Sequence, residues 1–89
     1  MSLSDIAAKA QAIGHVRRLQ ILRRLAVGGA NSDELCAELG GVALTTMRWH
    51  LDMLLEVGFV VASEGTPMVY FAVCPAVSSF IQEIEWLVR

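Results

Sequence analysis

The sequence predicts a mainly α-helical domain with one small β-hairpin, and two observations lead to this fold class. Apolar residues recur at helical spacing through most of residues 3–58 and again from 75 to 88. Between them, residues 59–73 hold two short runs rich in β-branched and aromatic residues, separated by a turn. With 89 residues in all, we treat residues 1–89 as a single domain.

Two helices are expected in the first third of the chain. Ser4 and Asp5 can cap a first helix with apolar residues at helical spacing, and Gly14 interrupts that pattern. The pattern resumes in a second helix, which Gly28 and Gly29 end. Its expected apolar stripe consists of Val16, Leu19, Leu22 and Leu25.

A pair of shorter helices is expected between residues 31 and 58. Asn31 can cap the third helix, with Glu34 as the reciprocal partner of a capping box, and Gly40-Gly41 ends it. The fourth helix covers about residues 44–56. Its buried face is predicted to carry Met47, Leu51 and Leu54.

The period changes after Gly58. The runs FVVAS and MVYFAV have the length and composition of strands, and the segment EGTP between them has turn chemistry. Pro75 suits the first turn of a last helix. The element order is therefore α-α-α-α-β-β-α, and two short helices followed at once by a hairpin predict a winged helix-turn-helix.

The polar side of the fourth helix carries the candidate DNA-binding residues. Trp49 points away from the apolar face, together with Thr45, while Thr46 and Arg48 lie on the flanks. In a helix-turn-helix, the second helix offers its N-terminal residues to the major groove. Threonine and arginine can bond base edges or phosphates, and tryptophan offers an N–H donor and a large apolar face. The structural alternative is that Trp49 packs under a loop or a partner subunit.

The charge balance leaves a second function open. The net charge is −2, whereas nucleic-acid-binding domains are usually basic. Asp52 and Glu56 add carboxylates to the side of the helix that carries Trp49. A winged helix used for protein–protein contact, with Trp49 as its anchor, is therefore the alternative to DNA binding.

Three segments together resemble a known family. IGHVRRLQIL, SDELCAELGGVALTTMRWHLDMLLEVGFV and EGTPMVYFAV are similar, in this order, to the blocks of the ArsR-type winged-helix transcriptional repressors. The resemblance covers roughly residues 10–75. It implies a homodimer that binds double-stranded DNA at a palindromic operator and pairs through residues 1–14 and 75–89. The interface residues so implied are Ile6, Ala10, Ile13, Phe80, Ile81, Ile84 and Leu87.

The resemblance also extends the expected DNA contacts, and the sequence departs from the family at two of the places concerned. Further contacts are expected from Asn31, Ser32, Ser63 and Thr66. Ala43 stands where relatives often have a serine that caps the recognition helix, a cap worth about 1 kcal/mol. The wing tip, residues 63–67, has no lysine or arginine, and each phosphate contact not made lowers affinity and flattens its salt dependence.

No cofactor, metal site or catalytic site is expected. Asn31 and Asp33 stand where arsenic-type relatives have cysteines, and the last helix has no histidine or cysteine. A thiol switch between Cys36 and Cys74 stays open as an alternative mode of regulation. The sequence shows no Gly-rich phosphate loop or catalytic triad, so an enzyme is not expected. Without a signal-peptide pattern or a run of about 18–20 apolar residues, we expect a cytoplasmic protein with no membrane partner.

Overall fold

The computed structural model describes the backbone of residues 2–88 and the side chains of residues 2–86. Within this range the chain forms five helices and a three-stranded sheet, which confirms the mainly helical fold with a hairpin. The elements are α1 (Leu3–Ile13), α2 (Val16–Leu25), β1 (Ala30–Asn31), α3 (Ser32–Glu38), α4 (Leu44–Glu56), β2 (Val60–Ala62), β3 (Val69–Ala72) and α5 (Cys74–Val88).

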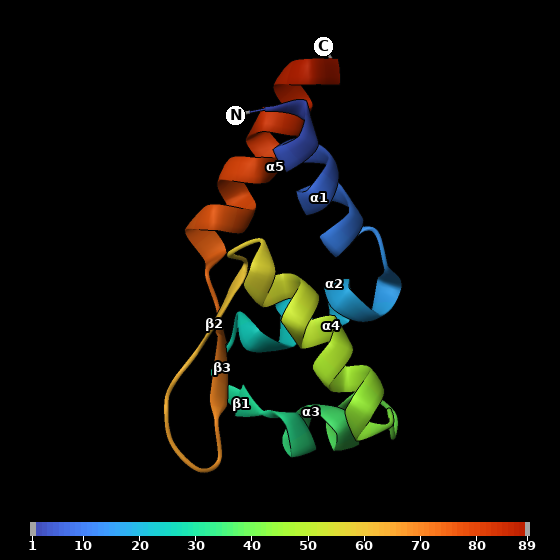
Figure 1. Ribbon diagram of the computed structural model, residues 1–89, viewed down its shortest axis with the longest axis vertical. Coiled ribbons are helices and arrows are strands. Elements are labelled where there is room, and N and C mark those ends of the chain that lie inside the picture. The colour runs from blue at the N-terminus through green and yellow to red at the C-terminus, as the bar shows by residue number, and fades with distance from the viewer. Residues whose placement is uncertain (1, 89) are drawn as a thin grey trace.

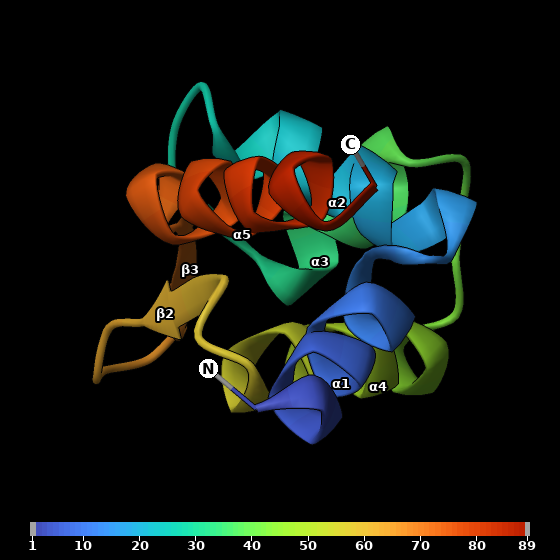
Figure 2. The same cartoon turned by 90° about the horizontal axis from the view of Figure 1, so that it is seen from above.

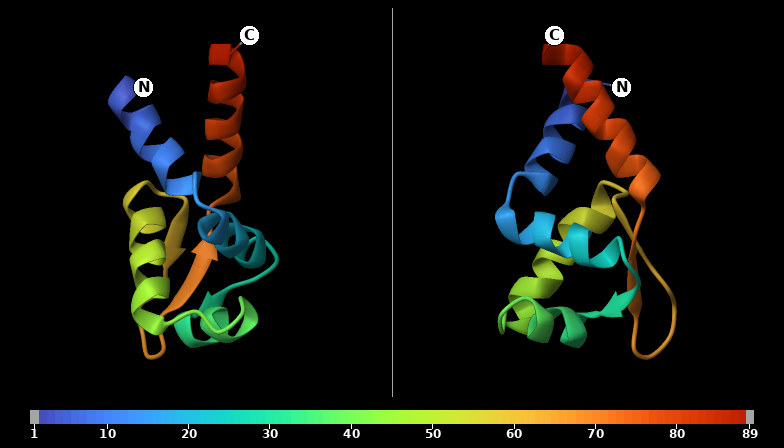
Figure 3. Two further views of the ribbon diagram at one scale, coloured as in Figure 1. Left: turned by 90° about the vertical axis from the view of Figure 1, so that its right-hand side faces the viewer. Right: turned by 180° about the vertical axis from the view of Figure 1, so that it is seen from behind.

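The helix-turn-helix and the two terminal helices lie at opposite ends of an elongated molecule, with a principal extent of 41 Å (Figure 1). The loop between β2 and β3, helix α3 and the start of α4 share one end. Helices α1 and α5 leave the other end as two diverging arms (Figure 3). Seen from that end, α1 lies over α4, and α5 lies on the side of α2 (Figure 2).

The sheet contains a strand that the sequence did not predict. Its order is β1-β3-β2, and both pairings are antiparallel. In β1, Ala30 pairs with Tyr70 and Asn31 with Val69, while Val61 of β2 pairs with Phe71. A strand of two residues is too short to show an alternating pattern. It exists because β3 offers hydrogen-bonding groups on its free side.

The core is built around the apolar face of α4. Met47, Leu51 and Leu54 are fully buried, as predicted, and pack with residues of α2, α3 and the sheet. Phe59 and Phe80 are in ring contact, with centroids 5.6 Å apart, and this contact anchors α5 to the domain. Burying each such ring contributes about 1.5–3 kcal/mol to stability.

The prediction for the stripe of α2 was partly wrong. Leu22 and Leu25 are buried as expected, but Val16 is 70% and Leu19 50% exposed. The buried stripe instead consists of Arg18, Ile21, Leu22 and Leu25. These residues share one helical face, and an arginine is buried among them because backbone carbonyls and a histidine accept its hydrogen bonds.

Caps and glycine turns set where the helices begin and end. Ser2, not Ser4 or Asp5, caps α1. The capping box of α3 is present: Asn31 Oδ1 accepts from the Glu34 amide at 2.8 Å, and Glu34 Oε1 accepts from the Asn31 amide at 3.0 Å. Gly40 and Gly41 have φ of +92° and +75°, which suits only glycine in the turn toward α4. Ala43 gives α4 no side-chain cap.

Among the residues described, no helix is both long and apolar enough to cross a membrane.

Candidate nucleic-acid interface

Helix α4, the candidate recognition helix, exposes the side chains that the sequence singled out. Thr45, Thr46 and Arg48 are exposed, and Trp49 is 54% exposed. Met47 and His50, which alternate with them, are buried. The helix therefore keeps a buried stem and a polar outer surface over its first two turns.

Four candidate residues from three separate parts of the chain line one groove. Asn31 and Ser32 at the start of α3, Arg48 of α4 and Thr66 of the wing surround a volume of about 380 Å³. The other lining residues are Asp33, Gly65, Pro67, Met68 and Tyr70. The sheet brings these elements together, because β1, which leads into α3, pairs with the strand that follows the wing tip. Thr45, Thr46 and Trp49 do not line this groove but lie on the same helix as Arg48.

Ser63 has a role within the wing itself. Its hydroxyl accepts from the Val69 amide at 3.2 Å and donates to the Val69 carbonyl at 3.3 Å, and its own amide donates to that carbonyl at 2.8 Å. These bonds close the base of the loop between β2 and β3. Ser63 is still exposed, but its side-chain hydrogen bonds stabilise the hairpin.

Most arginines of α2 serve the fold rather than the interface. Arg17 donates to the Leu39 carbonyl at 2.6 Å, just beyond α3. Arg24 forms an ion pair with Glu38 of α3 at 2.8 Å. These two contacts hold α3 against α2. Among the described residues, Arg48 has no hydrogen bond or ion pair within the chain, so its guanidinium is available to a ligand.

Sequence reasoning missed a cluster behind the recognition helix. Arg18 is only 4% exposed, and its Nε donates to Nδ1 of His50 at 3.1 Å. Its guanidinium carbon lies 5.0 Å from the ring centroid of Trp49, and the His50 ring lies 5.0 Å from the same indole. The ring of His15 lies 4.8 Å from that of His50. The signal was present in the sequence, because Arg18 shares the helical spacing of Ile21, Leu22 and Leu25.

The environment of His50 favours its neutral form. Burial is the main cause that lowers its pKa, and the nearby charges of His15, Arg18 and Arg17 lower it further. A neutral ring is also what the hydrogen bond requires, because Nδ1 must carry a lone pair to accept from Arg18.

The two arms carry the residues implied for a dimer interface. Ala10 and Ile81 are exposed, and Ile6, Ile13 and Ile84 are half-buried. Phe80 is only 1% exposed, so its side chain belongs to the core of the single chain. The side chain of Leu87 lies outside the described residues. Leu3 and Trp86 also leave large apolar surfaces open, at 78% and 76% exposure.

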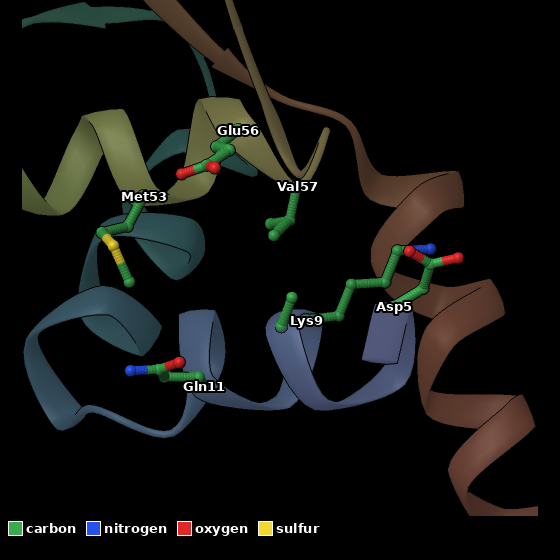
Figure 4. A pocket seen from close by; sticks show the side chains of 7 residues that line it. Asp5, Lys9, Gln11, Met53, Glu56 and Val57 are labelled. Carbon is green, nitrogen blue, oxygen red and sulfur yellow. The ribbon is translucent and has the colours of Figure 1, made fainter. Parts of the chain in front are cut away.

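A second cavity lies apart from this groove. This cavity, of about 570 Å³, lies between α1 and the end of α4, where Lys9, Gln11, Met53 and Glu56 are among its lining residues (Figure 4). None of the candidate DNA-binding residues lines it. Within the described part of the chain, no three His, Cys, Asp or Glu side chains gather as metal ligands.

Both cysteines are free thiols on elements at different ends of β3. Cys36 is half-buried in α3, and Cys74 is exposed at the start of α5. Helix α3 follows Asn31, which pairs with Val69 at the beginning of β3, whereas Cys74 follows the end of that strand. A thiol switch within one chain thus has no support from this arrangement.

Comparisons with known proteins agree with this geometry. The model of a helix-turn-helix domain family matches residues 13–61. The chain is similar to the solution structure of a homodimeric winged helix-turn-helix DNA-binding domain from Mycobacterium bovis, a possible ArsR-family transcriptional regulator. The two share 31% identity with a TM-score of 0.78 over 93% of this chain and 80% of that one.

Two further solved structures give the same result for the fold. An ArsR-like transcriptional regulator from Rhodococcus has a TM-score of 0.82 at 20% identity, over 94% of this chain and 79% of that one. A crystal structure of the same fragment from Mycobacterium bovis, a possible transcriptional regulatory protein, has a TM-score of 0.77 at 29% identity, over 98% of this chain and 95% of that one. A search among curated proteins found no significant match. The family match and the 31% identical relative together place this chain among the ArsR-type winged helix-turn-helix transcriptional regulators.

Proposed function

We propose that the protein is a homodimeric transcriptional repressor that binds a palindromic operator with α4 in the major groove. The observation that carries this proposal is the groove shared by Asn31, Ser32, Arg48 and Thr66. A DNA-binding protein of this class needs the recognition helix, the helix before it and the wing to face one surface at once.

The chemistry of this surface suits a nucleic-acid ligand. Arg48 can bond guanine bidentately or pair with a phosphate, and Thr45 and Thr46 can bond either bases or phosphates. The N-terminus of α4 has no side-chain cap, so its first-turn amides have no side-chain acceptor and suit a phosphate oxygen. These donors offset part of the repulsion from Asp33, which lines the groove, and from Asp52, which is exposed on α4.

The arms supply the second half of the proposal. Residues 1–14 and 75–89 would pair with a second copy and cover the apolar surface of residues such as Leu3, Ile81 and Trp86. The 31% identical relative is described as homodimeric. To bind successive major grooves, such a dimer must hold its two recognition helices about 34 Å apart.

The experiment is a binding titration with labelled DNA from the gene's own upstream region over a salt series. Arg48→Ala should weaken binding about tenfold or more and lower the salt slope by about one. Trp49→Ala should weaken binding as well. Arg23→Ala is the matched control, because Arg23 is exposed on α2 and lines no part of the groove. A reporter driven by that region should rise when the gene is deleted.

The outcome decides between DNA and a protein partner. The alternative is favoured by three exposed apolar side chains on the wing: Val61 at 51%, Met68 at 46% and Phe71 at 43%. If a folded, dimeric wild type binds no upstream DNA at low salt, the repressor proposal is wrong. The wing and Trp49 would then be tested as a protein-binding surface.

A further inference from the structure

We propose that Arg18 is a positioning residue for DNA recognition, which holds the indole of Trp49 in one orientation on the recognition helix. This inference rests on the proposed function, in which Trp49 contacts DNA. Arg18 itself is buried to 96% by the protein, since only 4% of it is exposed, so it cannot reach a ligand. Any effect that Arg18 has on DNA binding must therefore pass through its neighbours.

The guanidinium of Arg18 is held by three hydrogen bonds from two of its nitrogens. Its Nη1 donates to the carbonyl of Gln11 at 2.6 Å and to that of Ala12 at 3.2 Å, in the last turn of α1. The Nε donates to His50 at 3.1 Å. Among the described residues no carboxylate pairs with it, so its charge faces the negative end of the α1 dipole. A buried cation held by three directed hydrogen bonds has little freedom to move.

The same guanidinium also contacts the indole of Trp49. At 5.0 Å from the ring centroid, the cation lies within range of the indole π face. The His50 ring contacts the same indole at 5.0 Å and a tilt of 57°. Trp49 therefore has one part of its ring packed against two buried side chains that are hydrogen-bonded to each other, while 54% of the residue remains open to a ligand.

A side chain held in this way is preorganised for binding. An exposed tryptophan that rotated freely would lose rotamer entropy when it docked on DNA, whereas a clamped one has already lost it. The usual cost of immobilising one side chain at an interface corresponds to about a two- to tenfold change in affinity. Loss of the Arg18 contact should therefore weaken DNA binding by about two- to tenfold, without removal of any group that touches DNA.

The test is a double-mutant cycle on the same upstream DNA. Arg18→Gln keeps one amide donor near the position of Nε, where it can donate to His50, but it removes the cation from the indole and the donor to the α1 carbonyls. It should weaken binding two- to tenfold in the wild-type background and not at all in the Trp49→Ala background. Arg23→Gln on the same helix is the matched control and should change neither. Arg18→Lys, which keeps the cation, should restore part of the affinity and covers the case in which the glutamine variant does not fold.

A DNA-free measurement separates this inference from the proposed function. With Trp86→Phe, Trp49 is the only tryptophan of the chain. Arg18→Gln should then lower the fluorescence anisotropy of Trp49 and increase its quenching by acrylamide, while the unfolding midpoint confirms a folded variant. Unchanged anisotropy, or an equal loss of affinity in both backgrounds of the cycle, overturns the inference. If the wild type binds no DNA, the proposed function fails, and the anisotropy still decides whether Arg18 fixes the indole.

Discussion

The missing cap of α4 predicts that Ala43→Ser stabilises the protein. Ala43 has φ −62° and ψ 141°, the extended geometry of an N-cap, and it is exposed, so a serine fits without a backbone shift. Its hydroxyl could accept from the amide of Thr45 or Thr46, which now has no side-chain acceptor. Ser in place of Ala at such a position is worth about 0.5–2 kcal/mol.

The assay is thermal and urea unfolding followed by circular dichroism at one fixed protein concentration, because dimerisation would make the midpoint concentration-dependent. For a domain of this size, 1 kcal/mol corresponds to about 4–8 °C in Tm. The matched control is Ala37→Ser, at an exposed position inside α3. There serine gains no free amide and should cost up to about 0.5 kcal/mol. An equal or lower Tm for Ala43→Ser than for wild type would refute the reasoning.

Three further outcomes are expected. The pKa of His50 in the folded state lies below the ordinary value of about 6.5. The stability that the neutral ring contributes should therefore be complete above a pH of about 6.5 and be lost as the pH falls through the pKa of the folded state. His50→Gln should flatten this part of a urea-unfolding pH series. Phe80→Ala should cost about 3–5 kcal/mol in urea unfolding because the ring is buried in the core. Ile81→Ala, at 47% exposure, should mainly weaken the proposed dimer, as measured by light scattering. Arg24→Ala should cost less than about 1 kcal/mol by thermal unfolding, since its ion pair with Glu38 lies at the surface.

Short-range sequence patterns predicted the helix-turn-helix, α3 and α4, well. The capping box of Asn31 and Glu34 and the glycine pair at 40–41 depend on residues a few positions apart, and the structure has both. The apolar spacing of α4 gave its buried face and its bounds, because a long periodic helix is the clearest pattern in a sequence.

Short-range sequence patterns could not predict the contacts between segments that are distant in the chain. Strand β1 exists only through its pairing with Tyr70 and Val69, about forty positions away, and leaves no periodic trace of its own. The burial of Arg18 depends on carbonyls at the end of α1, which no helical projection of α2 can contain. The groove of the candidate site likewise required the pairing of β1 with β3 to bring the wing beside α3.

The use of arginines inside the fold has a consequence for target search in a genome. The chain has seven lysines and arginines, and Arg17, Arg18 and Arg24 are committed to carbonyls, a histidine and a carboxylate of their own chain. Attraction to random-sequence DNA comes almost entirely from basic side chains on phosphates. Competing genomic sites number about 10⁶–10⁹, so a weaker attraction leaves fewer molecules sequestered on them. Occupancy of a target would then depend more on base contacts than on the total length of DNA in the cell.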